Sequence, residues 1–425
     1  MEQRVAAPNG INIYYYKQPN THSICISLYI KAGTLYENGY SGITHFLEHL
    51  HFRRLGGRTQ KELYHQLECV GGYFGASTYK EFMQFYLTSS PKYFSDLARI
   101  ASDLLGSLEA NLNDFYAEKR LVLSEIREDH QKDDIDFISN KYIWGNTNLK
   151  NPILGNASSI GTFTLQLLQA EKEKTFAKQN MFFYVSGNFS DSDISRLAND
   201  VERYNLDNRP NTRNSNIAQI PDSFRNRNAF VKISQRKFYM HDVKISLDVD
   251  FNKISRHRLL YLDGILSEGL SSLLREELIE KKGLIYSFSS TIEQYANIGT
   301  YYFKFEVHKN KLLETIKSFV SVVKEVKKGI SEADMQTVRV FKTDNQKELL
   351  DDPENLNWTL AYENHILDNN YMDMSELADA YEQIDKGQLT MVANEIFKAN
   401  NILLISIGNK KGLSENKLHD ILSEL

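Results

Sequence analysis

The spacing of apolar residues changes along the chain between two patterns, and the change predicts a mixture of strands and helices. Residues 73–105 contain two short runs rich in aromatic and β-branched residues, followed after Pro91 by apolar residues at helical spacing. Residues 286–326 repeat this order of strand, turn, strand and helix. Residues 181–201 and 401–422 form a second matching pair, each with a strand, a Gly-Asn turn and a helix. Because both pairs are separated by a similar length of chain, the sequence indicates an internal duplication.

A polar segment between the repeated regions predicts where the two halves meet. Residues 205–228 are rich in Asn and Arg and show no apolar periodicity, which is typical of a linker. We therefore place one half at residues 1–212 and a homologous half at residues 213–425. Because each half combines helices with strands that can pair as hairpins, the predicted fold class is α+β, with an antiparallel sheet packed against helices in each half.

Capping residues predict the bounds of elements in the first half. Ser41 is a candidate N-cap for a helix that continues to about residue 52. Thr59 and Glu62 have the spacing of a capping box at the start of the next helix, and the Gly-Gly pair that follows would end it. A strand is expected next, at residues 73–79.

The first of these helices carries the strongest candidate for chemistry. His45 and His49 are four residues apart, so on a helix their imidazoles lie on one face, one turn apart. This spacing suits two ligands of one tetrahedral Zn²⁺ ion. Glu48 lies on the same side and could take a proton from a water on the metal without being a ligand itself. The alternative is a solvated helix face, because so short a motif also arises by chance. His51 lies on another face and is interpreted as a structural or surface residue.

A second segment offers the third protein ligand that a zinc site requires. Glu118 and Glu125 are seven residues apart, which is two turns along one helical face, in the segment EKRLVLSEIREDH. Alone, this pair would be interpreted as an ordinary charged stripe. Together with the upstream His-x-x-Glu-His motif, it favours a metal site with an open position for water.

Composition limits the classes of protein that fit this chain. It has 425 residues, of which 41% are hydrophobic and 25% charged, as expected for a globular protein with more than one domain. The net charge of −5 is spread along the chain, so no basic patch indicates nucleic acid as a partner. No apolar run approaches membrane-spanning length, and the N-terminal residues lack the apolar core of a signal peptide. Two cysteines, Cys25 and Cys69, cannot form a disulfide framework, so we expect a reducing, cytoplasmic location.

Several motifs together resemble the inverzincin metallopeptidases, the family of pitrilysin, insulin-degrading enzyme and the mitochondrial processing peptidase. They are His-Phe-Leu-Glu-His at residues 45–49, Glu-x6-Glu from residue 118, GGYFGAST at 71–78 and KKGLIYS at 281–287. The resemblance covers essentially the whole chain. It implies two α+β halves that form half of a clamshell chamber, in a short bacterial type whose chains pair as dimers.

The resemblance also implies a role for each matching residue. His45, His49 and Glu125 would ligate one Zn²⁺ ion per chain, and Glu48 would be the general base. Glu118 would be a carboxylate that orients the site and supports catalysis. The implied activity is zinc-dependent hydrolysis of unfolded peptides or of a peptide precursor, such as a leader or bacteriocin-like peptide. The alternative is a non-catalytic structural or assembly subunit related to the processing peptidases.

The segment Gly75, Ala76, Ser77 and Thr78 resembles the strand on which the family binds its substrate. An exposed edge strand has unpaired N–H and C=O groups, so a peptide could add to it as a further strand. An ordinary hairpin strand is the alternative. The family often has Asn where this chain has Gly75, so a side-chain contact to the substrate is missing here.

The second half departs from the resemblance at one position. The family pattern S-S-R-L, followed by G-L-x-Y-S, supplies an Arg and a Tyr that stabilise the oxyanion of the reaction. Here Tyr286 is in place, but Leu273 occupies the position of the arginine, and Arg275 lies on a different side of a helix. One interpretation is that Tyr286 or a nearby basic residue is enough to stabilise the oxyanion. The other is that a related chain lacking His-x-x-Glu-His supplies both the Arg and the Tyr. The resemblance therefore implies a homodimer or such a heterodimer.

Overall fold

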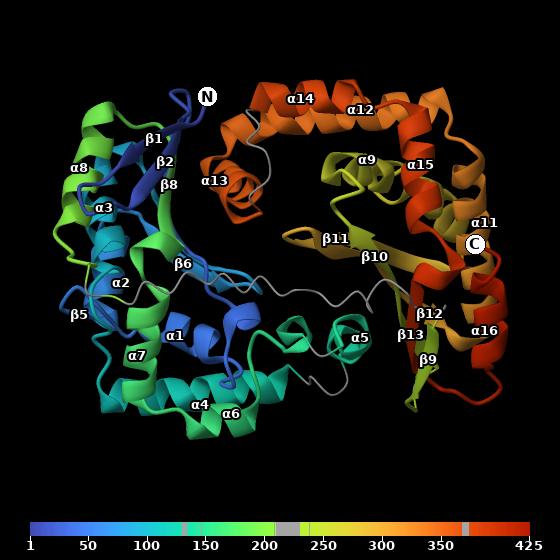
Figure 1. The fold of residues 1–425 in the computed structure, drawn as a ribbon, viewed down its shortest axis with the longest axis horizontal. Coiled ribbons are helices and arrows are strands. Elements are labelled where there is room, and N and C mark those ends of the chain that lie inside the picture. Colours follow the sequence, from blue (N-terminus) through green and yellow to red (C-terminus); the bar gives the residue numbers. More distant parts are fainter. Residues whose placement is uncertain (130–133, 146, 208, 210–229, 238, 368–373) are drawn as a thin grey trace. The chain divides into compact units, whose positions relative to one another are not determined.

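The computed structural model describes residues 1–129, 134–145, 147–207, 209, 230–237, 239–367 and 374–425 (Figure 1). The chain divides into two compact units. The first unit contains Met1–Gln131, Thr147–Ala218 and Lys347–Asp373, and the second contains Lys132–Asn146, Gln219–Gln346 and Met374–Leu425. The predicted boundary between residues 212 and 213, and most of the predicted linker, lie outside the described residues, so both stay predictions.

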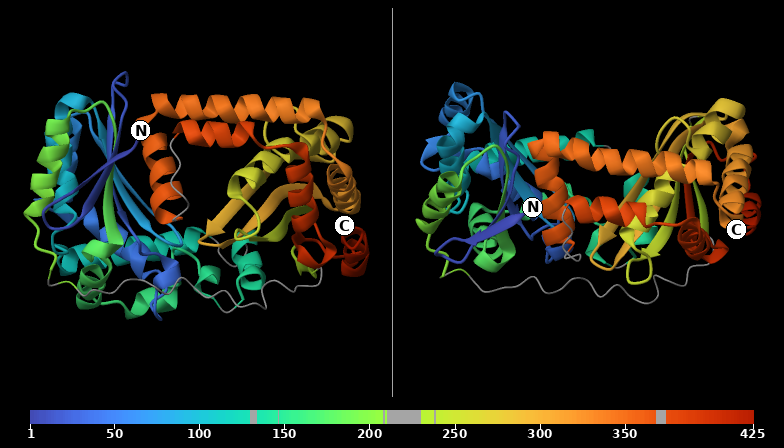
Figure 2. Two further views of the ribbon diagram at one scale, coloured as in Figure 1. Left: turned by 45° about the horizontal axis from the view of Figure 1, so that its top comes forward. Right: turned by 90° about the horizontal axis from the view of Figure 1, so that it is seen from above.

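The first unit is built on a six-stranded sheet with strands in the order β1 (Gln3–Ala6), β2 (Asn12–Lys17), β8 (Met181–Gly187), β3 (Ile24–Ile30), β7 (Met83–Ser89) and β6 (Tyr73–Thr78). Neighbouring strands are antiparallel except β2 and β8, which are parallel. Every residue of β3 and β8 is buried, because helices cover both faces of the sheet. Helix α3 (Phe94–Asp103) lies on one face and helix α13 (Pro353–Ala361) on the other, as Figure 2 shows.

The remaining elements of the first unit surround this sheet. Helix α8 packs against α3, and a short hairpin of β4 and β5 leads into α2. These elements are α1 (Ile43–His51), β4 (Arg54–Leu55), β5 (Arg58–Thr59), α2 (Gln60–Cys69), α4 (Leu112–Glu128), α6 (Ala157–Thr162), α7 (Leu165–Thr175) and α8 (Asp191–Glu202).

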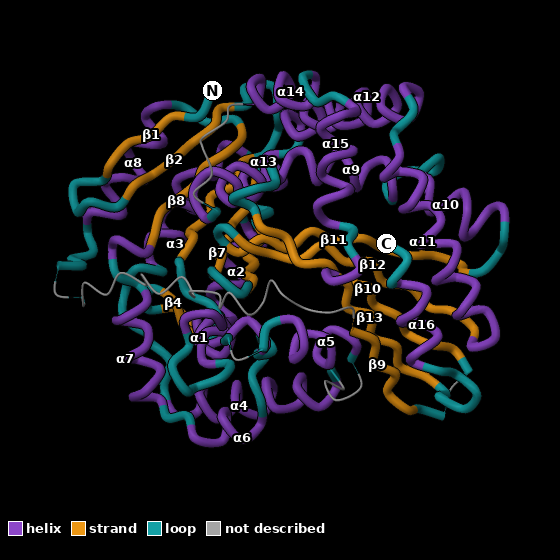
Figure 3. The backbone as a smooth tube through the Cα atoms, turned by 45° about the vertical axis from the view of Figure 1, so that its right-hand side comes forward, coloured by secondary structure: helices purple, strands orange, loops and turns teal. Residues whose placement is uncertain are grey.

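The second unit has a five-stranded sheet in the order β11 (Ile285–Tyr295), β12 (Ile298–His308), β10 (Met240–Asp250), β13 (Ile402–Gly408) and β9 (Phe230–Gln235) (Figure 3). Only β13 and β9 are parallel. A short π-helical turn, Glu276–Lys281, follows α10. The helices of this unit are α5 (Ile135–Ile143), α9 (Arg256–Leu266), α10 (Leu273–Arg275), α11 (Leu312–Lys328), α12 (Glu332–Glu348), α14 (Met374–Glu382), α15 (Lys386–Ile396) and α16 (Glu415–Leu422).

The two sheets have the same topology. Strands β6-β7-β3-β8-β2 of the first correspond one by one to β11-β12-β10-β13-β9 of the second. In each of these orders, the last two strands are the parallel pair. The α+β fold class is therefore confirmed, and the elements of the repeated sequence regions occur in the predicted order.

Each unit also contains a helix from the other part of the chain. On α13, the fully buried Asn357 amide donates to the carbonyl of Tyr184, and the Tyr29 hydroxyl donates to the Asn357 oxygen at 2.9 Å. On α5, the carboxylate of Asp136 pairs with Lys244 and Lys304, each at 2.7 Å. Such an exchange buries the second face of each sheet, and a sequence divided into two consecutive halves does not anticipate it.

Two local predictions have clear outcomes. The capping box of Thr59 and Glu62 is present at the start of α2. That helix ends at Cys69, followed by Gly71 with a positive φ of 56°, and β6 begins at Tyr73.

Among the described residues, no helix has both the length and the apolar composition needed to cross a membrane.

Candidate metal centre

Helix α1 holds the His-x-x-Glu-His motif, and its apolar side is anchored in the core of the first unit. Phe46, Leu47 and Leu50 are completely buried. His45 and Glu48 are also buried, each with 7% of its surface exposed. The motif therefore does not lie on a solvated helix face, which was the alternative interpretation of the sequence.

The start of α1 differs from the prediction. Gly42, with a φ of 87°, is the N-cap, so the expectation that Ser41 caps the helix was wrong. The buried carboxylate of Glu37 instead accepts hydrogen bonds from the backbone N–H groups of Gly42 at 2.9 Å and Thr44 at 3.2 Å. Burial raises the pKa of Glu37 to about 7, although these hydrogen bonds oppose the shift. A carboxyl group from a preceding loop thus satisfies the free donors of the helix.

Helix α4 brings two glutamates to α1. Phe115, Glu118 and Val122 form a buried stripe at helical spacing, and the Phe115 ring lies 5.7 Å from that of Phe46 on α1. Glu125 lies two turns after Glu118, and its side chain is 44% exposed. The predicted pair of glutamates therefore has one buried and one partly open member.

Three potential ligand atoms converge between these helices. Nε2 of His45 lies 3.2 Å from Nε2 of His49, and Oε2 of Glu125 lies 3.9 Å from the first and 3.8 Å from the second. A zinc ion about 2.1 Å from each of three tetrahedral ligands would separate them by about 3.4 Å. The arrangement therefore fits a Zn²⁺ ion with a fourth position left for water, and this trio is also the cluster of metal-binding side chains found among the described residues.

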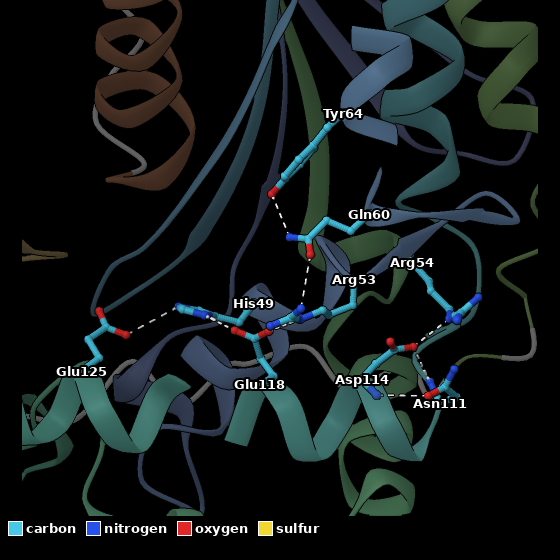
Figure 4. A network of polar contacts seen from close by, with 9 residues as sticks. All are labelled: His49, Arg53, Arg54, Gln60, Tyr64, Asn111, Asp114, Glu118 and Glu125. Carbon is cyan, nitrogen blue, oxygen red and sulfur yellow. Dashed lines mark hydrogen bonds and ion pairs between the residues drawn. The ribbon is translucent and has the colours of Figure 1, made fainter. Parts of the chain in front are cut away.

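The orientation of His49 is fixed by a chain of polar contacts (Figure 4). Its Nδ1 donates to Oε1 of Glu118 at 2.7 Å, which leaves the lone pair of Nε2 directed toward His45 and Glu125. Glu118 is held in turn by the Nε of Arg53, and Arg53 donates to Gln60 on α2 at 3.2 Å. Sequence reasoning missed Arg53; its position four residues after His49, on the same helical side, was the available signal.

The two histidines differ in protonation, and only the lowered pKa of His45 favours the neutral imidazole that binds a metal. Burial, together with the charge of His49, lowers the pKa of His45 to about 3, so its imidazole is neutral. Burial opposes the charged form of His49 too, but the hydrogen bond and charge of Glu118 outweigh it and raise the pKa. Nδ1 of His45 is buried without a hydrogen-bond partner among the described residues. Three electron-pair donors facing one another favour a shared cation.

Glu48 lies beside this trio without belonging to it. Its Oε2 accepts a hydrogen bond from the Thr78 hydroxyl at 2.5 Å. Burial raises the pKa of Glu48, while the Thr78 hydrogen bond and the nearby His49 oppose the rise. A carboxylate with a raised pKa accepts protons more readily near neutral pH. The contact of Thr78 with Glu48 was not foreseen from the sequence, which assigned Thr78 only to the substrate strand.

Comparison with known families agrees with this geometry. The model described as Insulinase (Peptidase family M16) matches residues 12–157, which include all the residues of the candidate centre. The model described as Peptidase M16 inactive domain matches residues 162–339. The chain belongs to peptidase family M16.

Relatives and solved structures resemble this chain over nearly its whole length. An uncharacterized zinc protease of Rickettsia felis is 24% identical over 402 residues, covering 92% of this chain and 94% of the relative. A protease from Helicobacter pylori shares the fold with a TM-score of 0.82 at 19% identity, covering 96% of this chain and 99% of the other. A chain of complex III2 from Candida albicans has a TM-score of 0.77 at 15% identity, with 99% of each chain covered.

Strand β6 of this M16 chain lies at the edge of its sheet, and among the described residues it pairs only with β7. Gly75 and Thr78 are buried, whereas Ala76 and Ser77 are partly exposed. Helix α1 contacts β6, and the Phe74 ring lies 4.6 Å from that of Phe52 just after α1. The predicted substrate strand therefore has a free edge next to the helix that carries the motif.

The residues predicted from the second M16 half lie in the second unit. Tyr286 lies near the start of β11, where the pairing with β12 shifts register, and its side chain is 95% exposed. It lines a cavity of about 890 Å³. Leu273 begins the short helix α10, and Arg275 pairs with Glu280 at 3.2 Å. The predicted catalytic role of Tyr286 stays a prediction.

Proposed function

We propose that this chain is a zinc-dependent endopeptidase that hydrolyses unfolded peptides. The observation that carries the proposal is the convergence of His45, His49 and Glu125 on one point, with the carboxylate of Glu48 beside it. In the proposal, the three converging residues hold one zinc ion per chain. The Rickettsia felis relative is named an uncharacterized zinc protease, which supports the same activity.

Each residue of the centre has a distinct task in the proposed reaction. Zinc, when bound, supplies the Lewis acidity that makes a water molecule acidic near neutral pH. Glu48 accepts the proton of the attacking water at its carboxylate and passes it to the leaving amine. Thr78 holds the Glu48 carboxylate through its hydroxyl, and Glu118 keeps Nδ1 of His49 protonated. Neither Glu48 nor Glu118 needs to be a ligand.

The free edge of β6 provides the proposed binding site for the peptide backbone. A peptide that adds as a further strand gains main-chain hydrogen bonds with little selection by sequence. Only an extended segment can pair in this way, so folded proteins are excluded as substrates. Gly75, Ala76, Ser77 and Thr78 would pair with the residues around the cleaved bond.

The test uses the purified chain and a mixture of unfolded peptides. Elemental analysis should find about one zinc ion per chain. Mass spectrometry should find internal cleavage that a chelator stops and zinc restores. A protein without zinc that cleaves no peptide, alone or with every candidate partner, would sink the proposal.

The second half of the proposal concerns a partner chain. Leu273 occupies the position of the family arginine, so a related chain that lacks His-x-x-Glu-His would supply an Arg and a Tyr to stabilise the oxyanion. The purified chain would then bind zinc but cleave slowly until the partner is added. Full activity of the chain alone, unchanged by Tyr286→Phe, would exclude this heterodimer. Activity that is lost in Tyr286→Phe without any other chain present would indicate that this chain supplies its own tyrosine.

A non-catalytic subunit is the second candidate, because a chain of complex III2 shares the fold over its full length. A subunit without catalysis has no use for converging ligands beside a buried glutamate, which favours the peptidase.

A leader or bacteriocin-like precursor is the substrate class that we propose. We place the protein in the cytoplasm, since its two cysteines, Cys25 and Cys69, are both free thiols.

A further inference from the structure

Strand β6 has two faces with different neighbours. Phe74 packs against Phe52, and Thr78 hydrogen-bonds Glu48, so this side of the strand faces α1. Because side chains alternate along a strand, Tyr73, Gly75 and Ser77 are on the opposite face. A peptide that pairs with the free edge of β6 would alternate in the same way. Every second side chain of the peptide would then lie beside the Tyr73 face.

The ring of Tyr86 occupies the space above Gly75. Tyr86 is the β7 residue directly opposite Gly75 in the sheet. A Cβ atom at position 75 would lie 2.5 Å from Cζ and 2.6 Å from the hydroxyl oxygen of Tyr86, closer than such contacts allow. The absence of a side chain at Gly75 therefore leaves room for the Tyr86 ring beside β6. The ring takes the place where an asparagine side chain would project.

Tyr73 extends this aromatic surface toward the free edge. Its ring centroid lies 5.8 Å from that of Tyr86, at an angle of 45°, and 57% of Tyr73 is exposed. Burial and the Tyr73 hydroxyl raise the pKa of Tyr86, so the Tyr86 ring is neutral. Aromatic rings disfavour an acidic neighbour, because a carboxylate that leaves water beside them gains no opposite charge in return. The two rings form a largely apolar surface, and Tyr73 keeps it open on the side where a paired peptide would lie.

We propose that Tyr73 and Tyr86 form a specificity site that selects a large apolar side chain of the bound peptide, with aromatic residues preferred over small polar ones and acidic ones rejected. The site rests on the proposed function, because it assumes that a peptide pairs with β6. Two rings already held at a tilted contact distance stack on a third ring at little cost in side-chain entropy. Only peptide residues on the Tyr73 face would show the preference.

The experiment measures binding rather than turnover, in the Glu48→Gln chain loaded with zinc. The probes are unfolded peptides of Ser, Gly and Lys in which one Phe, Ser or Asp is moved position by position. At one position of the peptide, or at every second position, the peptide with Phe should bind about tenfold more tightly than the peptide with Ser. Asp should bind more weakly than Ser at the same positions.

Variants connect that preference to the two rings. Tyr73→Ala, which changes an exposed side chain, should reduce the Phe-to-Ser ratio to near one, and Tyr86→Ala should do the same. Tyr73→Phe should keep the ratio. Tyr116→Ala is the matched control, because Tyr116 on α4 is exposed to a similar extent, 55%, and should leave the ratio unchanged.

The outcomes separate this site from the proposed function. A Phe preference that survives Tyr73→Ala and Tyr86→Ala, or peptides that bind without any preference, would overturn the specificity site. Failure of the Glu48→Gln chain to bind any peptide would overturn it as well. Positional preference in binding, combined with a zinc-loaded wild type that cleaves nothing, would support the site and refute the peptidase.

Discussion

Two pairs of helices occupy the same places in the repeat: α1 and α4 in the first unit, and α9 and α12 in the second. The two pairs are held together differently. Between α1 and α4, ionisable side chains converge on one point. Between α9 and α12, the Tyr261 hydroxyl donates to the carbonyl of Met335 at 2.6 Å. Gly264 lets Val338 approach so closely that a Cβ at position 264 would lie 2.6 Å from it.

The second pair shows what this fold needs for stability alone. The Tyr261 hydrogen bond and the close contact with Val338 help to join its helices, and the buried Lys342 of α12 is paired with Glu268. Ionisable groups taken out of water reduce stability unless each is paired, so a fold gains nothing from facing two imidazoles and a carboxylate. Their presence between α1 and α4 is therefore better explained by chemistry than by packing.

Removing a converging ligand should have the largest effect. We expect His45→Ala, His49→Ala and Glu125→Ala each to lose bound zinc and to reduce peptide hydrolysis to background, because each change removes an electron-pair donor. His257→Ala on α9 is the matched control in the second pair and should keep both. Elemental analysis and a peptide cleavage assay measure these effects. Retention of stoichiometric zinc in all three ligand variants would contradict the assignment.

Glu48→Gln should separate metal binding from hydrolysis. The amide keeps the shape of the side chain and can still contact Thr78, but it cannot accept the proton. We expect unchanged zinc content and a rate of hydrolysis lower by about 10²- to 10⁴-fold. Near-normal turnover in this variant would show that another group is the general base.

Arg53 should affect the centre through Glu118 rather than directly. Without the guanidinium, the Glu118 carboxylate loses one of its two partners and holds His49 less firmly. Arg53→Met should weaken zinc binding by about 10- to 100-fold in a competition with a chelator. Arg54→Met is the control, because Arg54 pairs with Asp114, further from the ligands. Equal zinc affinity in the two variants would contradict the positioning role.

The smallest effect is expected in the second helix pair. Tyr261→Phe removes the hydroxyl that joins α9 to Met335 and should lower the free energy of unfolding by about 1 kcal/mol. Zinc content and hydrolysis should stay at the wild-type level. Urea unfolding followed by circular dichroism measures the change. A loss of zinc in Tyr261→Phe would mean that the two helix pairs are not independent.

Local sequence patterns predicted the parts of the molecule that depend on neighbouring residues. The His-x-x-Glu-His helix, the capping box of α2 and the repeated order of strands and helices all follow from spacing within short segments. The exchange of α5 and α13 was not predicted, because it depends on contacts such as Asn357 with Tyr184 between residues far apart in the chain.

The same limit applies to the candidate centre. The three candidate ligands could be chosen from their spacing and from the family resemblance. The contacts that orient them could not, because Glu37 reaches α1 from a preceding loop and Thr78 reaches Glu48 from another strand. Gly75 was recognised as a departure from the family, but only the structure shows that the Tyr86 ring fills its place.

The most direct test of the account is anomalous X-ray scattering at the zinc edge from crystals of the wild-type chain. We predict one strong anomalous peak between α1 and α4, about 2.1 Å from Nε2 of His45 and from Nε2 of His49 and in contact with the Glu125 carboxylate. Glu48 should be near the peak without bonding to it, and no peak should occur between α9 and α12. A zinc peak elsewhere, or none at the three ligands in zinc-supplemented crystals, would contradict the central claim.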